Sequence, residues 1–316
     1  MKAVQINQYG GIEVLEINDI PKPTLNNGKI LVEVYAASIN PIDYKIRSGA
    51  LKEWIPLEFP ITLGGDFAGI VSEVGEEVRD FAVGDEVFGS AIVVGGGSGA
   101  FAQFSATKTS SAAIKPKNVD FVQAAALPLT GSSAIQALEE HIKLQKGQKI
   151  LIHGGAGGIG TVAIQLGKAL GAYVATTVST NEMDYVKSLG ADEVIDYKQK
   201  NQKFEEILKD FDAVFDTVGG DVTNKSFKVL KKGGIIVSML GQPNEELAKE
   251  FEVTAIGQNT KTNAEHLKRL AELVDSGKIK THIDKEFTLD QVKEAFTYQE
   301  QNHPKGKVVL LSAHSQ

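Results

Sequence analysis

The chain contains no cysteine, and this absence excludes several kinds of chemistry. The protein can form no disulfide, use no thiolate nucleophile and build no zinc site from sulfur ligands. Apolar runs stay shorter than the roughly 20 residues that a membrane-spanning helix needs. The first residues, MKAVQINQYGG, lack the basic segment, apolar stretch and cleavage site of a secretory signal. We therefore expect a cytoplasmic protein with no membrane span.

Positive charge is also in deficit, because 33 Lys and Arg residues face 40 Asp and Glu residues, which gives a formal net charge of −7. An acidic chain disfavours nonspecific attraction to nucleic acid or anionic membranes, so we expect small-molecule partners and no nucleic acid. With 316 residues, 42% of them apolar, the chain is long enough for two domains.

The histidines are few and lack the spacing of metal ligands, so no metal is expected to bind stoichiometrically. We interpret them as surface or turn residues: His141, His153, His266, His282, His303 and His314.

The most informative segment present is QKILIHGGAGGIG, residues 148–160, in which an apolar strand runs into a glycine-rich turn. Gly155, Gly157 and Gly160 fit the G-x-G-x-x-G fingerprint of dinucleotide sites. The next helix should begin near Gly158 and Ile159, and its first amides would face a diphosphate. A second strand over residues 172–178 completes a βαβ unit, which a plain glycine turn would not explain.

Two architectures follow each other along the chain. The first 120 or so residues contain short β-branched segments such as KAVQI, EVLEI, KILVEVYAASI and DEVFGSAIVV, and GGGSG at 95–99 is interpreted as a flexible surface loop. Residues from about 121 to 257 alternate strands with helices, as in a doubly wound parallel sheet. The tail should return to the first domain, so we predict domains at 1–122, completed by 261–316, and at 123–260, with a cleft between them for the ligand.

Six segments in this order resemble the zinc-independent quinone oxidoreductase branch of the medium-chain dehydrogenase/reductase family: SINPIDYKIRSG, LGGDFAGIVSEVG, AALPLTGSSAIQAL, HGGAGGIGTVAIQLGKALGA, KSLGADEVIDY and FDTVGG. The details are most similar to NADPH-dependent alkenal/enone and quinone reductases. The resemblance implies an α/β fold with a GroES-like catalytic domain and a Rossmann domain. It also implies a homodimer through edge strands, for which residues 250–257 are the candidate unless they form an ordinary buried final strand.

The same comparison bears on metal. Zinc-dependent relatives carry a cysteine before the SINPID-like region and a histidine in a G-H-E motif. Here the corresponding stretches are residues 36–40 and Gly64, Gly65 and Asp66, so those ligands are missing.

The expected cofactor is NADPH. NAD sites place an acidic residue at the end of the second strand to hold the ribose 2′-hydroxyl, whereas this chain has Ser179 and Thr180, whose hydroxyls can donate to a 2′-phosphate. Tyr197 matches a family tyrosine near this phosphate, or is an exposed aromatic at a strand end. Glu182 stands where some members carry lysine; Lys198 or Lys200 could supply that cation, or be merely solvated.

Hydride transfer needs a donor for the acceptor oxygen that becomes negative. Without zinc, a quinone or α,β-unsaturated carbonyl suits the site better than an alcohol, because its charge spreads into a phenolate or enolate. Asn40 could orient nicotinamide or substrate, and Tyr44 or Lys45 could donate to the carbonyl oxygen. The alternatives are an Asn-Pro turn, a helix capped by Asp43 and a solvated lysine.

Three further residues are expected beside the cofactor by resemblance and position: Thr130, Gly219 and Leu240. Thr130 could instead be a helix-interior residue and Leu240 a packing residue, while Asp216 could satisfy only local backbone. We therefore expect an NADPH-dependent reductase of quinones or enones. The alternatives are a noncatalytic NADPH-binding sensor or structural module and a metal-free alcohol or carbonyl dehydrogenase.

Overall fold

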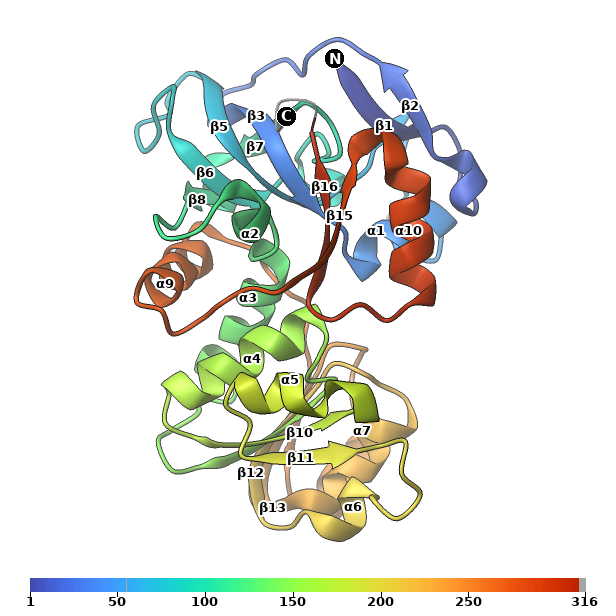
Figure 1. Cartoon of the computed structure of the whole chain (residues 1–316), viewed down its shortest axis with the longest axis vertical. Helices are drawn as coiled ribbons and strands as arrows, with labels where there is room; N and C mark the ends of the chain where they lie inside the picture. Colours follow the sequence, from blue (N-terminus) through green and yellow to red (C-terminus); the bar gives the residue numbers. More distant parts are fainter. Residues whose placement is uncertain (55, 313–316) are drawn as a thin grey trace. The chain divides into compact units, whose positions relative to one another are not determined.

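The computed structural model describes residues 1–54 and 56–312, and the chain divides into two compact units (Figure 1). The mixed-sheet unit comprises Met1–Leu129, Thr262–Asp275 and Thr281–Gln316. The parallel-sheet unit comprises Thr130–Lys261 and Ser276–Lys280. In the described part of the chain, no helix is both long and apolar enough to cross a membrane.

The parallel-sheet unit confirms the predicted Rossmann-type architecture. Its six strands all pair in parallel, in the order β11-β10-β9-β12-β13-β14. The order reverses direction beside the first strand, and in such sheets ligands bind outside the carboxyl ends of the strands at this point. The strands are β9 (Lys149–His153), β10 (Tyr173–Val178), β11 (Glu193–Asp196), β12 (Phe211–Asp216), β13 (Leu230–Ser238) and β14 (Thr254–Gly257).

The central strand β9 is mainly apolar because both faces of the sheet are covered. Four of its five residues are buried, as expected for a strand covered on both faces. Figure 1 shows α4 and α5 along one side of this sheet. The helices of the unit are α3 (Pro128–Ile135), which begins just before the unit does, α4 (Gly158–Ala169), α5 (Met183–Ser188), α6 (Phe204–Ile207), α7 (Asp221–Ser226) and α8 (Glu245–Glu250).

The mixed-sheet unit contains a seven-stranded sheet with the path β15-β16-β3-β5-β6-β8 and with β7 paired to β3. A smaller sheet has the order β2-β1-β4. The last strand of the chain, β16, thus lies inside the larger sheet, between β15 and β3. The strands are β1 (Lys2–Ile6), β2 (Glu16–Asp19), β3 (Lys29–Ser38), β4 (Ile61–Thr62), β5 (Asp66–Val74), β6 (Glu86–Ser90), β7 (Phe104–Lys108), β8 (Ala112–Ile114), β15 (Ile283–Thr288) and β16 (Lys307–Leu311).

Aromatic side chains fill the centre of each unit. Phe67, Phe101 and Phe296 are fully buried in the mixed-sheet unit, and Phe211 and Phe227 are buried in the parallel-sheet unit. Figure 1 shows α10 beside β15 and β16, where it supplies Phe296 to the core. The helices of the mixed-sheet unit are α1 (Pro41–Ser48), α2 (Phe121–Ala125), α9 (Ala264–Asp275) and α10 (Val292–Gln301).

Two local predictions were wrong. Residues 13–17 were expected to form a strand, but Ile12–Val14 form a 3-10 turn and only then does β2 begin. The strand expected to reach residue 94 ends at Ser90. The GGGSG segment lies outside the strands, and the Lys29 and Lys108 ammonium groups donate to its carbonyl oxygens at 2.8 and 3.0 Å, while its flexibility stays a prediction.

Candidate functional site

The glycine-rich turn joins β9 to α4, as the sequence predicts. Gly157 is the N-cap of α4, with φ −73° and ψ 171°, a conformation open to any residue. The turn is held to the neighbouring strand because the Gly155 amide donates to the Thr177 carbonyl oxygen at 3.3 Å. The turn therefore presents the first amides of a 12-residue helix at the carboxyl edge of the sheet.

The three fingerprint glycines meet different demands. A Cβ on Gly155 would lie 2.1 Å from Thr176 Oγ1, and one on Gly160 would lie 2.2 Å from the Gly154 carbonyl oxygen. Those two glycines are required by the protein itself. A Cβ on Gly157 would meet only the Gly154 oxygen, at 3.5 Å, which is ordinary contact. The space in front of Gly157 is thus one that a side chain would fill, and the turn fits a nucleotide diphosphate.

A buried histidine lies beneath the turn. His153 is fully buried at the end of β9, with Nδ1 2.9 Å from Thr177 Oγ1 and Nε2 2.9 Å from Ser226 Oγ. Burial lowers the pKa of His153 to about 4, although the negative charge of Asp216 opposes the shift. The imidazole is therefore neutral at physiological pH and ties three elements together.

Two histidines correct the expectation that all six lie on the surface or in turns, because His153 and His266 are buried. The last of the six, His314, lies outside the described residues. The signal for His153 was present in the sequence, since it directly follows the apolar run of residues 150–152, which is buried.

The end of β12 lies next to the glycine turn in the sheet, and the end of β13 lies one strand further along. The Asp216 carboxylate accepts hydrogen bonds from the amides of Val218 and Gly219 at 2.9 and 3.1 Å, so it shapes the backbone after β12. The structure brings Gly219 and Leu240 together, because a Cβ on Gly219 would lie 2.7 Å from the Leu240 Cβ. Leu240 and Val218 are about half exposed, which places apolar side chains at the carboxyl edge of the sheet.

The end of β10 carries a pair of hydroxyl groups that already have partners. The Ser179 hydroxyl donates to the Glu182 carboxylate at 2.7 Å, and the Ser179 amide donates to the same oxygen at 3.0 Å. The Thr180 hydroxyl donates to the Asp196 carboxylate at 2.6 Å. Both groups that the sequence suggested as phosphate donors therefore point at carboxylates.

Tyr197 lies beside this pair and is 57% exposed. Partial burial raises the pKa of the Tyr197 phenol, the negative charge of Glu182 raises it further, and a hydrogen bond with Ser179 opposes the rise. The Lys198 ammonium lies 5.4 Å from the centre of the Tyr197 ring, so one cation stands near this corner of the unit.

In the mixed-sheet unit, a buried charged network surrounds Asn40, the N-cap of α1. The Asn40 amide nitrogen Nδ2 donates to Asp66 Oδ2 at 2.9 Å, and Oδ1 accepts from Lys307 Nζ at 2.5 Å. Lys307 also donates to the Ile39 carbonyl oxygen at 2.7 Å. The side-chain atoms with which Asn40 would meet a ligand are thus engaged with the protein.

Asp43 completes this network and caps α1, because its Oδ2 accepts from the Asn40 backbone amide at 2.7 Å. Its Oδ1 is buried and has no hydrogen-bond partner among the described residues. Burial raises the pKa of Asp43 to about 7; the Asn40 hydrogen bond opposes the rise and the charge of Asp66 adds to it. A carboxyl that keeps its proton avoids burying a second negative charge beside a single lysine.

Burial also raises the pKa of Asp66 and lowers that of Lys307, and their mutual attraction opposes both shifts. Sequence reasoning missed Lys307 altogether. A lysine that opens the apolar strand KVVLL was the available signal, because a charge in a buried strand needs a partner.

The two candidate donors lie on the next turn of α1. Tyr44 and Lys45 are both partly buried. Burial raises the pKa of the Tyr44 phenol, and the negative charge of Glu300 adds to the rise, so Tyr44 holds its proton at neutral pH. Thr130 is buried in α3.

Across residues 1–54 and 56–312, no group of three or more His, Cys, Asp or Glu side chains is arranged to hold a metal ion. The expectation of a metal-free chain stays a prediction, which elemental analysis of the purified protein can test.

Comparisons with known proteins match both parts of the chain. Residues 26–117 match the model described as alcohol dehydrogenase GroES-like domain, and residues 189–310 match the model described as zinc-binding dehydrogenase. The chain is 38% identical to 2-methylene-furan-3-one reductase of Solanum lycopersicum over 319 residues, which cover 98% of this chain and 79% of that protein. It is 37% identical to the chloroplastic NADPH-dependent alkenal/one oxidoreductase of Arabidopsis thaliana, with the same coverage.

Solved structures agree with these relatives. The quinone oxidoreductase of Coxiella burnetii superposes with a TM-score of 0.89 at 36% identity, over 98% of this chain and 99% of that chain. The Escherichia coli quinone oxidoreductase, solved as a complex with NADPH, superposes with a TM-score of 0.87 at 28% identity, over 98% and 100% of the two chains.

Proposed function

Because the chain belongs to the medium-chain dehydrogenase/reductase family, in its zinc-independent quinone oxidoreductase branch, we propose that it is an NADPH-dependent reductase of quinones or α,β-unsaturated carbonyls. The observation that carries this proposal is the glycine turn. At Gly157 a Cβ would make only one ordinary contact with the protein, so the space in front of this residue is open to a ligand. NADPH bound there supplies the hydride.

The residues proposed to hold NADPH lie at the carboxyl edge of the parallel sheet, apart from Thr130, which lies in α3. The amides after Gly155 and Gly157, including those of Gly158 and Ile159, suit the diphosphate because they are the first amides of α4. Gly219, Leu240 and Thr130 are proposed at the nicotinamide end, which the exposed apolar surface of Leu240 supports. Ser179, Thr180 and Tyr197 are proposed at the ribose phosphate.

The acceptor is proposed to gain its proton or hydrogen bond from the mixed-sheet unit. Tyr44 is one candidate donor, because its partly buried phenol is protonated at neutral pH. Lys45 is the second candidate. Asn40 is proposed to set the start of α1, on which both donors stand, because its amide is held by Asp66 and Lys307.

The roles of the domains follow the same division. We propose residues 1–122, completed by 261–316, as the catalytic domain and residues 123–260 as the dinucleotide-binding domain. The two compact units differ from these bounds by a few residues near 129 and 261 and by the short segment Ser276–Lys280.

A turnover assay tests the activity. NADPH oxidation is measured with quinones, with short 2-alkenals and with saturated aldehydes of matched length. The proposal expects oxidation with the conjugated acceptors and little with the saturated ones, because only a conjugated acceptor spreads the incoming charge. Nucleotide binding without turnover of any acceptor would favour a sensor or structural module, and turnover of alcohols would favour a metal-free dehydrogenase.

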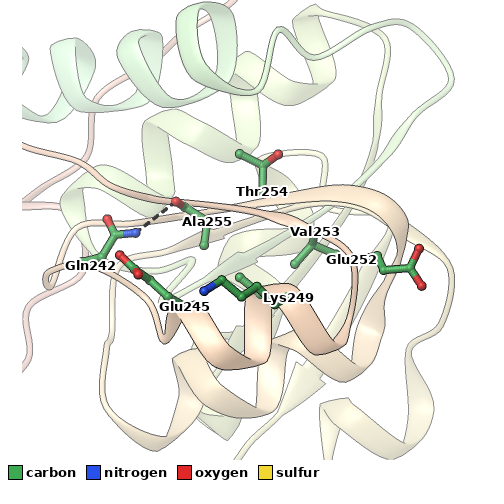
Figure 2. Close-up of a pocket in the computed structure, with 8 residues that line it drawn as sticks. Gln242, Glu245, Lys249, Glu252, Val253, Thr254 and Ala255 are labelled. Carbon is green, nitrogen blue, oxygen red and sulfur yellow. Dashed lines mark hydrogen bonds between the residues drawn. The ribbon is translucent and has the colours of Figure 1, made fainter.

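A homodimer through the edge of the parallel sheet is also proposed. Among the described residues β14 pairs with β13 alone, and the side chain of Gln242 covers its outer edge. Gln242 Nε2 donates to the Ala255 carbonyl oxygen at 3.1 Å, and its Oε1 accepts from the Gly257 amide at 2.9 Å. Figure 2 shows Gln242 bonded to Ala255 at one end of a surface hollow of about 500 Å³. A strand from a second copy would replace these two hydrogen bonds.

Light scattering across a concentration series tests the dimer. Gln242→Ala should strengthen the association, because the backbone groups of β14 become free to pair. A monomer at every concentration would contradict this proposal.

The cytoplasm is the proposed compartment, although the Arabidopsis relative is named as chloroplastic, and imaging of a fluorescent fusion would locate the protein.

A further inference from the structure

The end of β10 is where dinucleotide-binding sheets distinguish the two nicotinamide cofactors. An acidic residue there accepts a hydrogen bond from the ribose 2′-hydroxyl of NADH, and a cation or neutral donors there accommodate the 2′-phosphate of NADPH. In this chain the first acidic residue past β10 is Glu182, which closes the short 3-10 turn Thr180–Glu182.

Glu182 reaches back to the strand end through a capping box. One of its oxygens accepts from both the amide and the hydroxyl of Ser179, at 3.0 and 2.7 Å. The Glu182 amide in turn donates to the Ser179 carbonyl oxygen at 3.0 Å. The carboxylate is therefore fixed beside Ser179, rather than free to leave toward solvent.

The hydroxyl of a serine has a single proton to donate. While the Ser179 hydroxyl donates to Glu182, it cannot donate to a phosphate oxygen. The same holds for Thr180, whose proton is given to Asp196 at 2.6 Å. The negative charges of Glu182 and Asp196 both raise the pKa of Tyr197, which places both carboxylates close to that ring.

We infer that Glu182 sets the choice between the two cofactors: it lowers the affinity for the 2′-phosphate by its charge and by holding the Ser179 hydroxyl. This inference rests on the proposed nucleotide site. NADPH binding then requires that Ser179 exchange Glu182 for the phosphate, with Lys198 as a nearby counter-charge. NADH binding requires no exchange, because Glu182 can accept the ribose 2′-hydroxyl.

Two variants separate the two parts of this effect. Glu182→Gln removes the charge but keeps an oxygen that can accept from Ser179, whereas Glu182→Ala removes both. Asp184→Asn is the matched control, because it removes an exposed carboxylate two residues away on α5. Dissociation constants for NADPH and NADH are measured by fluorescence titration, and thermal melting confirms that each variant is folded.

Glu182→Gln should tighten NADPH binding roughly tenfold and leave NADH binding within about twofold, because a screened unit charge near a phosphate is removed. Glu182→Ala should tighten NADPH further while weakening NADH. The gain from Glu182→Gln should shrink in high salt. Titration with 2′,5′-ADP and 5′-AMP should repeat the contrast without the nicotinamide.

The inference is overturned if the ratio of the NADPH and NADH dissociation constants in Glu182→Gln stays within twofold of the wild type, or if Asp184→Asn changes that ratio equally. Failure of the proposed function looks different, since it is the absence of NADPH-dependent turnover of conjugated acceptors by the wild type. Binding titrations and turnover therefore test the two proposals separately.

Discussion

Replacement of Gly157 by alanine is expected to weaken NADPH binding while leaving the fold intact. The added Cβ would meet only the Gly154 carbonyl oxygen, at 3.5 Å, and the backbone at Gly157 has a φ of −73°, so neither a clash nor strain arises. Alanine is a poorer N-cap than glycine, but it also restricts the unfolded chain, and both effects are below about 1 kcal/mol. The free energy of unfolding should therefore change little.

The expected loss of affinity follows from the same methyl group. It occupies the space through which the diphosphate would approach the first amides of α4. Losing one charge-assisted hydrogen bond costs about 1.5–3 kcal/mol, which corresponds to a rise in the dissociation constant of roughly 10- to 150-fold.

Fluorescence titration with NADPH and thermal melting measure the two quantities on the same sample. Gly160→Ala is the contrasting control, because its Cβ would lie 2.2 Å from the Gly154 oxygen and should destabilise the fold itself. If Gly157→Ala binds NADPH as tightly as the wild type, the turn does not cradle the diphosphate. If that variant unfolds, the space in front of Gly157 is not free.

Three further predictions concern the network in the mixed-sheet unit and the metal. Folding raises the pKa of Asp43 from 3.8 to about 7, so the stability that protonated Asp43 contributes is present at low pH and is lost as the pH rises through about 7. The Asp43→Asn side chain cannot ionise, so the free energy of unfolding of this variant, measured in urea, should rise relative to that of the wild type as the pH increases. The difference should grow from about pH 4 to about pH 7 by at most about 1.4 kcal/mol per pH unit. A difference that does not change with pH would contradict a buried, protonated Asp43. Lys307→Met should lower the free energy of unfolding by about 3 kcal/mol, because it leaves Asn40 Oδ1 without its donor and the buried Asp66 carboxylate without a cation. A variant as stable as the wild type would refute this role. Elemental analysis should find no stoichiometric zinc, and one zinc per chain would reject the metal-free prediction.

Features encoded within short stretches of sequence were predictable. The strand, the glycine turn and the helix around Gly157 lie within about twenty consecutive residues. Their hydrophobic periods and their glycine spacing both indicate the same strand–turn–helix unit. The alternation of strands and helices in the parallel-sheet unit is also encoded in short stretches of sequence. The fold class predicted from it was confirmed. The 3-10 turn at Ile12–Val14 was not, because its β-branched residues favour a strand on propensity alone.

Contacts between distant residues could not be predicted. Asn40 and Lys307 are separated by 267 positions, and the sequence around each residue does not identify the other as its hydrogen-bond partner. The sequence shows that Ser179 and Thr180 carry hydroxyl donors, and they were therefore expected to be available to a ligand. Only the structure shows which acceptor receives each proton. Sequence reasoning therefore named Ser179 and Thr180 as candidate donors, and the structure adds that Glu182 and Asp196 accept their protons.

The position of β16 has a consequence for the order in which the protein matures. A chain made from its N-terminus completes all six parallel strands by Gly257, whereas the larger mixed sheet still lacks β15 and the interior strand β16. Until Lys307 has been synthesised, Asp66 lacks the cation that faces it in the folded chain, and β3 exposes the edge that β16 will cover. During the synthesis of the roughly fifty residues between Gly257 and Lys307, the six parallel strands are complete while β3 keeps an open edge, to which a chaperone or a matching strand from another chain can bind.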